Sequence, residues 1–106
     1  MISENRVEQS LKFLRETDTL AANARAMMVG LDDQKKTIFA VEYVNATGSQ
    51  GDKAEIARSS EAYIEHLKKY KDAVFDYEEL RNRRQTEILI VETWRSQNAN
   101  MRRGNI

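Results

Sequence analysis

The amino-acid sequence predicts an all-α protein, a long antiparallel helical hairpin that resembles a coiled coil and assembles into a four-helix bundle or a higher homo-oligomer. Three observations support this fold class. The 106-residue chain has no proline and only four glycines, the two residues that most often end helices. Strong helix formers such as Ala, Glu, Lys and Leu are plentiful. Apolar residues in the second half recur at alternating gaps of four and three, the spacing of a coiled-coil seam.

The first predicted helix covers residues 3–46, with Ser3 as a candidate N-cap. Nine apolar residues fall near one face: Val7, Leu11, Leu14, Ala21, Ala24, Met28, Leu31, Ile38 and Val41. Two alternatives interrupt this helix. Gly30, followed by "LDD", would end one helix and start another at Asp32 or Asp33, and "TIFAVEYV" has the composition of a short strand. Because the apolar spacing keeps its phase across Gly30, and a lone strand would lack a partner, we expect one helix.

The stretch "NATGSQGDKAE" contains the predicted turn at residues 47–52, where Gly48 and Gly51 supply backbone freedom. A phosphate-binding loop is the alternative. The Walker A pattern GxxxxGK[ST] is not met, because the two glycines are only three residues apart and Ala54 replaces the Mg²⁺-binding hydroxyl. Asp52 would also repel phosphate. We therefore expect a bend between helices, with no nucleotide or other cofactor.

The second predicted helix covers residues 53–100 and begins with Asp52 as N-cap and Glu55 as its capping-box partner. Its seam contains Ile56, Ser60, Tyr63, Leu67, Tyr70, Val74, Tyr77, Arg81, Arg84, Ile88, Val91, Arg95 and Asn98. If the chain folds back near residue 49, the numbers of facing residues add to about 98. This rule places Tyr70 opposite Met28, as interdigitated packing requires, and Arg81 beside Asp18 as an ion pair.

Two helices alone would leave much of their apolar surface exposed, and small bundles without disulfides or metals are marginally stable. Leu89, Ile90 and Trp94 lie outside the main seam, so we predict that they form an oligomer contact. The simplest assembly is a homodimer that makes a four-helix bundle. A monomer that folds only on a different partner is the alternative.

Residues that carry chemistry are scarce. There is no cysteine, which excludes disulfides, thiolate metal sites and thiol nucleophiles. The only histidine, His66, lacks the glutamate three residues earlier that a di-iron helix would supply, so we expect it in a solvated or rim position and not as a metal ligand. Tyr63, Tyr70 and Tyr77 would stack on nucleic-acid bases only if they were exposed, and we expect them in the core instead. We predict that the protein is not an enzyme, with no catalytic, metal or cofactor-binding residues.

Charge is balanced overall, with 17 basic and 17 acidic residues, but residues 79–106 carry a net charge of +3. An alternative function, DNA binding, would use the arginines of this region: Arg81, Arg83, Arg84, Arg95, Arg102 and Arg103. The last two belong to a predicted basic tail, residues 98–106. The simpler explanation is a helix end whose arginines interact with the helix dipole. The bias is smaller than that of a dedicated nucleic-acid-binding protein.

The expected compartment is the cytoplasm. The start "MISENRVEQ" lacks the basic and apolar regions of a signal peptide. The longest apolar runs, such as "ILIV", have four residues and are far shorter than the roughly 18 residues of a membrane helix. We therefore expect no membrane contact.

The stretch "VNATGSQGDKAEIARSSEAYIEHLKKYKDAVFDYEELRNRRQTEILIVETWRSQNANMRR" resembles small uncharacterised helical proteins of tailed phages and bacterial prophages. The shared features are a Gly-Ser turn, an "ARSSEAY"-like helix start and a "VETWRSQNANMRR"-like end. The resemblance implies an accessory role beside replication or recombination genes and assigns no catalytic residue. The expected function is a non-enzymatic interaction module of a phage or prophage, with itself and another phage or host protein as partners. A DNA-binding accessory protein is the alternative.

Overall fold

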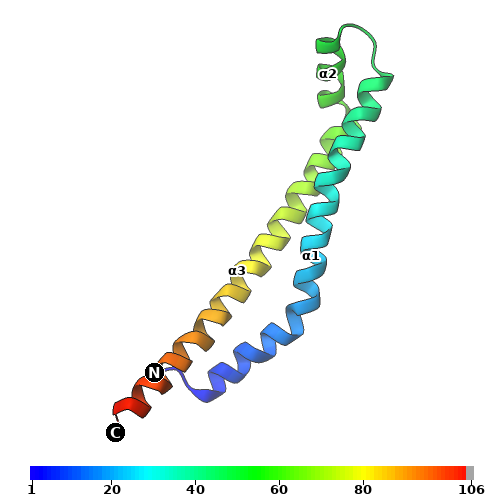
Figure 1. The fold of residues 1–106 in the computed structure, drawn as a ribbon. Helices are drawn as coiled ribbons and strands as arrows, with labels where there is room; N and C mark the ends of the chain where they lie inside the picture. Colours follow the sequence, from blue (N-terminus) through cyan, green and yellow to red (C-terminus); the bar gives the residue numbers. More distant parts are fainter. Residues whose placement is uncertain (105–106) are drawn as a thin grey trace. The chain divides into compact units, whose positions relative to one another are not determined.

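The computed structural model describes residues 1–104, and all the regular structure in this range is helical. The elements are α1 (Glu4–Asn45), α2 (Gln50–Ser59) and α3 (Glu61–Gly104) (Figure 1). The all-α prediction is confirmed. The strand alternative for "TIFAVEYV" is wrong, because this segment lies within α1.

Helix α1 runs without a break through Gly30, as predicted. It starts beside Ser3, whose Oγ accepts a hydrogen bond from the backbone N–H of Arg6 at 3.1 Å. Two residues expected on its inner face, Leu11 and Val41, are instead exposed. Ser10 and Thr17 occupy the buried positions, so the face of α1 that meets α3 is more polar than the apolar pattern suggested.

The turn between α1 and α2 depends on Gly48, whose φ of 112° lies in the left-handed region that favours glycine. Ser49 then caps α2: its Oγ accepts the N–H of Asp52, and the Asp52 carboxylate accepts the N–H of Ser49. The predicted cap at Asp52 is therefore wrong by three residues. A capping box exists, but Asp52 is its acidic member and Ser49 begins it.

The predicted continuous helix of residues 53–100 is divided at Ser60, which has an extended backbone (φ −65°, ψ 147°). The Ser60 N–H donates to the carbonyl of Ala57 and closes α2. Its Oγ accepts the N–H of Tyr63 at 3.3 Å and so caps α3. Helix α3 continues to Gly104, so residues 98–104 of the predicted tail are helical. Residues 105 and 106 lie outside the described part of the chain.

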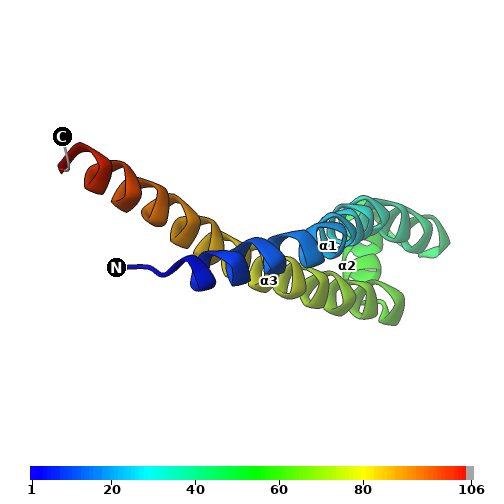
Figure 2. The same cartoon turned by 90° about the horizontal axis from the view of Figure 1, so that it is seen from below.

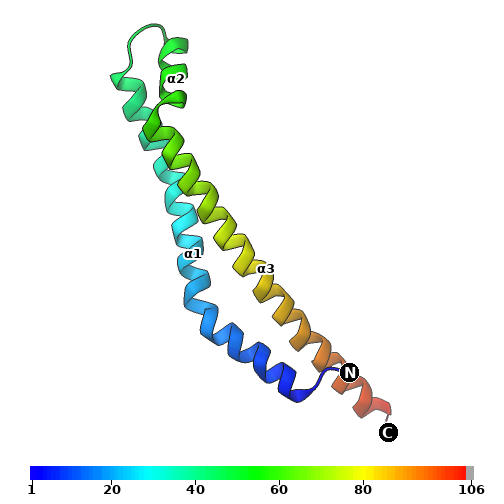
Figure 3. The same cartoon turned by 180° about the vertical axis from the view of Figure 1, so that it is seen from behind.

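The chain divides into two compact units, each built from antiparallel segments of α1 and α3. The terminal unit comprises Met1–Ala22 and the residues from Glu78 onward, so it contains the start of α1 and the later part of α3 (Figure 2). Within this unit, Ile2 N–H donates to Gln97 Oε1. The turn unit comprises Asn23–Tyr77, where α1 and α3 lie side by side and α2 covers the end near the turn (Figures 1 and 3). In both units, hydrogen bonds join residues whose numbers add to about 98, as the fold-back rule predicts.

The residues of α3 that face α1 differ from the predicted seam at every second position. Leu80 and Trp94 are partly buried, whereas Arg81 and Arg95, predicted on the seam, are exposed. Next to three predicted seam residues, α3 also carries His66 and Ala73, which are buried, and Glu87, which is partly buried. In residues 1–104 the buried apolar side chains are few: Val7, Ala57, Ala73 and Val91.

Candidate functional site

A polar cluster links α1 and α3 in the terminal unit. The carboxylate of Glu87 accepts a hydrogen bond from Arg6 Nη2 at 3.0 Å and one from Ser10 Oγ at 2.5 Å. Arg6 Nη1 also donates to Ser10 Oγ at 2.9 Å, so the three side chains form a closed ring of contacts. Ser10 is fully buried, and the Glu87 side chain is only 19% exposed. The carboxylate is therefore well satisfied where α1 and α3 meet.

These contacts shift the ionisation of both charged groups. The hydrogen bond from Arg6, followed by the one from Ser10, lowers the pKa of Glu87 below its ordinary value of about 4.5. The same contact with Glu87 raises the pKa of Arg6. Both shifts favour the charged forms, so the ion pair persists at neutral pH and weakens only in acid.

A second polar link lies one to two turns away. Arg84 Nη1 donates to Thr17 Oγ1 at 2.6 Å and to the carbonyl of Leu14 at 2.8 Å, and Arg84 Nη2 contacts Asp18 at 3.5 Å. The sequence placed Arg81 beside Asp18, and this assignment is wrong. Arg81 is exposed and pairs with Glu78 on its own helix, because the side chain that points at α1 is Arg84.

The chemistry of the cluster suits structure better than catalysis. Ser10 is the only hydroxyl that contacts a carboxylate there, and it has no exposed surface through which a substrate would reach it. A salt-bridged Glu87 is also a weak base, because its pKa is lowered. The directional bonds fix which residues of α1 and α3 face each other, as a polar residue does in a coiled-coil core.

In the turn unit the contact between α1 and α3 is mainly aromatic. The Phe39 and Tyr63 rings meet edge to face with centroids 6.0 Å apart, and Lys35 lies over the ring of Tyr70. The predicted core position of these tyrosines agrees with their partial burial. The prediction for His66 is wrong: it is 5% exposed, and its Nε2–H donates to the Leu31 carbonyl at 2.6 Å.

The six arginines suggested for DNA binding do not form one patch. Arg84 is turned inward, and Arg83 lies over the ring of Phe13. Arg83 is nevertheless exposed, as are the other four: Arg81, Arg95, Arg102 and Arg103. Three of the exposed arginines, Arg81, Arg95 and Arg102, are separated by multiples of seven residues and so share one side of α3.

The predicted oligomer-contact residues also occupy two faces. Ile90 and Trp94 are four residues apart on one face of α3 and are partly buried within the chain. Leu89 is 59% exposed and points about 100° away from Ile90, since each helical residue turns the chain by that angle. Leu89 is thus the member of the set most accessible to another molecule.

Sequence reasoning missed Glu87, Ser10 and Arg6 as a linked group. The sequence did contain an indication of this contact. The numbers of Ser10 and Glu87 add to about 98, and the two residues lie one helical turn from the buried Val7 and Val91. Both residues were passed over because they are polar. Within residues 1–104, no helix is long and apolar enough to span a membrane, and no group of three potential metal-binding side chains occurs.

Comparisons with known proteins leave the family open. No protein-family model matches the chain, and neither the curated proteins nor the solved structures give a significant match.

Proposed function

We propose that the protein is a non-enzymatic structural and interaction module that acts as a homo-oligomer. The resemblance to helical proteins of tailed phages and prophages motivates the further proposal of an accessory role in a phage or prophage. Another phage or host protein would then be held by the assembled helices.

The observation that carries the proposal is the imbalance between buried and exposed apolar side chains. Only four apolar residues of the described chain are buried, and two of them are alanines. By contrast, several large apolar side chains are more than half exposed: Leu20, Met27, Val41, Val44, Phe75 and Leu89. Full burial of such a side chain contributes about 2 kcal/mol, so self-association would add stability that the monomer lacks.

Sedimentation equilibrium across a range of protein concentrations tests self-association. We expect an average mass above the 12.3 kDa of one chain. A mass of 12.3 kDa at every concentration would contradict the proposal.

The contact predicted around Leu89 is tested separately by Leu89→Glu, with Leu89→Met as the matched control. Because Leu89 is exposed within the chain, both variants should keep the circular dichroism of the wild type. The charged variant should shift the average mass toward the monomer, and the apolar control should not. An oligomer that survives Leu89→Glu would place the contact elsewhere.

A second candidate function, DNA binding, is favoured by the exposed arginines on one side of α3, namely Arg81, Arg95 and Arg102. Such a stripe would contact phosphates, and its affinity would fall steeply with salt. We expect an electrophoretic shift of DNA at low salt that is lost when these three arginines become alanine. Arg83→Ala is the control, because Arg83 lies on another face. No shift of DNA by the wild type at low salt would exclude this function.

A further inference from the structure

Helix α1 carries a second stripe of regularly spaced residues within the turn unit, which we call the outer seam. Its members are Asn23, Met27, Gly30, Gln34, Thr37, Val41 and Val44, with gaps that alternate between four and three. The α3-facing stripe of α1 contains other residues, among them Met28 and Lys35. The large apolar members of the outer seam are well exposed: Met27 61%, Val41 52% and Val44 75%. Met27 also borders Ala73 and Asp76 of α3, whereas Val41 and Val44 lie in an exposed hollow formed by α1 residues alone. The outer seam thus has coiled-coil spacing on a largely exposed face of α1.

The outer seam is also free of charge. Charged residues make up 32% of the sequence, so about two of any seven positions would be charged by composition alone. All charged residues of α1 beyond Asn23 fall outside the outer seam: Arg25, Asp32, Asp33, Lys35, Lys36 and Glu42. A face that only contacted water would not need this exclusion, whereas the core of a helix–helix interface does.

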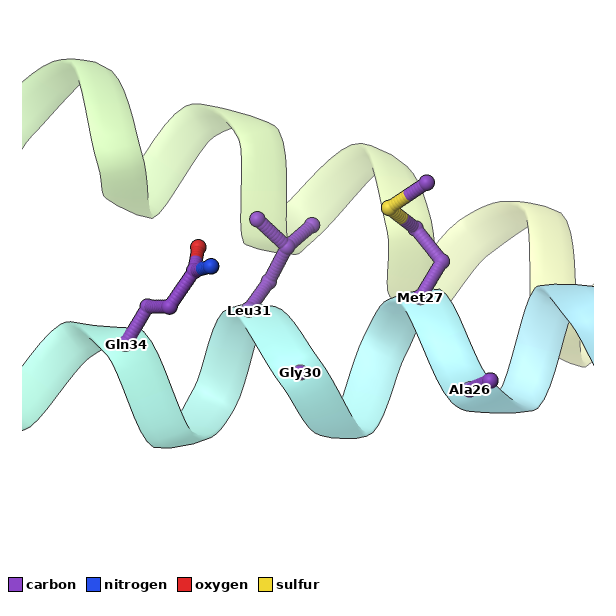
Figure 4. Close-up of a pocket in the computed structure, with 5 residues that line it drawn as sticks. All are labelled: Ala26, Met27, Gly30, Leu31 and Gln34. Atoms are coloured by element: carbon purple, nitrogen blue, oxygen red, sulfur yellow. The ribbon is translucent and has the colours of Figure 1, made fainter.

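Gly30 lies at the middle of the outer seam, and packing within the chain does not require a glycine there. Glycine is the least favourable helix residue after proline, and a Cβ added here would meet nothing within 4 Å. Gly30 lies instead in a hollow of about 280 Å³ lined by Ala26, Met27, Leu31 and Gln34 (Figure 4). The missing side chain leaves room for a side chain from outside.

We propose that the outer seam binds the outer seam of a second copy of this chain, with the two α1 helices antiparallel. This inference rests on the proposed self-association and names a surface for it that is separate from Leu89. The facing layers are Met27 against Val44 of the second copy, Gly30 against Val41, and Gln34 against Thr37. Each layer occurs twice because of the two-fold axis.

Size and polarity match in these layers. Val41 of the second copy fills the hollow at Gly30, so the smallest residue faces a β-branched one. Gln34 and Thr37 are both donors and acceptors of hydrogen bonds, so they satisfy each other without a charge. A charged partner would find no counter-charge in the outer seam, whereas an identical uncharged seam is complementary to it.

Other pairings of the same two helices fit less well. An antiparallel shift by one heptad in one direction would bring Asp33 next to Asp33 of the second copy, and these like charges would repel. A shift in the other direction would leave Gly30 opposite residue 48, beyond the end of α1. A parallel pairing would place Gly30 against Gly30 and leave a void in the middle of the interface. The proposed register avoids both faults.

Cysteine cross-linking tests the register directly, because the natural chain has no cysteine. Gly30→Cys and Val41→Cys chains, made with tags of different length, are mixed and oxidised mildly. We expect a disulfide between the two different chains. Gly30→Cys alone should not cross-link, because the two Gly30 positions would lie about 16 Å apart along the helices, too far for a disulfide. Val29→Cys replaces Gly30→Cys in the control mixture, because Val29 is exposed but lies outside the outer seam.

A second variant keeps the test independent of oxidation. Val41→Glu should raise the dissociation constant at least about tenfold, because it buries unpaired charges at the interface. Val29→Glu, the matched control, should leave it unchanged. Circular dichroism of each single variant checks that the helices remain.

The outcomes separate this inference from the proposed function. A wild-type monomer at every concentration overturns both. A wild-type oligomer in which Gly30→Cys cross-links to itself shows parallel pairing and overturns the inference alone. So does an oligomer that gives no cross-link between the Gly30→Cys and Val41→Cys chains and tolerates Val41→Glu.

Discussion

The terminal unit and the turn unit hold the same two helices together by different chemistry. In the terminal unit, directional polar bonds cross between α1 and α3, through Glu87 with Arg6 and Ser10 and through Arg84 with Thr17. In the turn unit, aromatic rings and the buried His66 fill the contact, with Phe39 touching Tyr43, Tyr63 and Arg58.

This difference in chemistry suggests that the two units contribute differently to the stability and to the register of the hairpin. Rings provide buried area and tolerate small shifts, because aromatic pairs remain favourable over centroid distances of about 4.5–7 Å. Polar bonds contribute less net energy, yet they fail when either partner moves by a residue. We infer that the turn unit supplies more of the stability and that the terminal unit sets the register.

The largest effect should follow the removal of the Phe39 ring. Phe39→Ala removes contacts with three side chains, and we expect a loss of about 2 kcal/mol and a fall in Tm of about 10 °C. Hydrogen exchange should rise mainly at amides within Asn23–Tyr77. Phe39→Leu, which keeps most of the volume, should lose less. Equal losses of exchange protection in both units would refute the division of tasks.

A smaller effect should follow the neutralisation of Glu87. Glu87→Gln keeps the shape of the side chain but removes its charge. Loss of the partly solvated ion pair with Arg6 should lower the free energy of unfolding by about 1 kcal/mol and Tm by about 5 °C. The increase in amide hydrogen exchange should occur mainly in the terminal unit. Glu92→Gln, at an exposed position, is the control.

The same variant predicts a pH dependence. Because the folded chain lowers the pKa of Glu87, this carboxylate stabilises the fold fully above its ordinary pKa of about 4.5, and the contribution is lost as pH falls through the lowered value. The Tm difference between wild type and Glu87→Gln should therefore shrink below about pH 4.5. A constant difference down to pH 2 would mean that the charge on Glu87 is not its cause.

The smallest effect, and one of opposite sign, is expected at Gly30. Gly30→Ala places a Cβ in open space within the chain, so the isolated hairpin should gain about 0.5–1 kcal/mol of helix stability. Thermal unfolding at the lowest usable concentration measures this gain. A loss of stability in that dilute, dissociated state would mean that the site is more crowded within one chain than the structure indicates.

Much of the fold followed from patterns that depend on the backbone. The bounds of α1, its continuity through Gly30 and the fold-back rule needed only helical spacing and a glycine turn. The break at Ser60 was missed because it involves neither glycine nor proline. It depends on a serine that caps the following helix with its side chain, and many serines within helices look the same in sequence.

The polar side chains were harder to predict. The seam of α3 was assigned by a strict alternation of gaps of four and three residues, which selected Leu67, Val74 and Ile88. The adjacent residues His66, Ala73 and Glu87 are buried or nearly so, because each finds a hydrogen bond or a close-packed position on α1. Burial of a polar residue depends on its partner across the contact, and one helix pattern does not contain that information.

The fold-back of α3 along α1 has a consequence for the order of folding. The bond from His66 to Leu31 closes a loop of 35 residues, whereas those from Arg6 and Ile2 close loops of 81 and 95. Closing the Arg6 loop from a free chain would cost about 0.7 kcal/mol more in entropy than closing the His66 loop. Contacts near Gly48 should therefore form first, and the two chain ends should meet last.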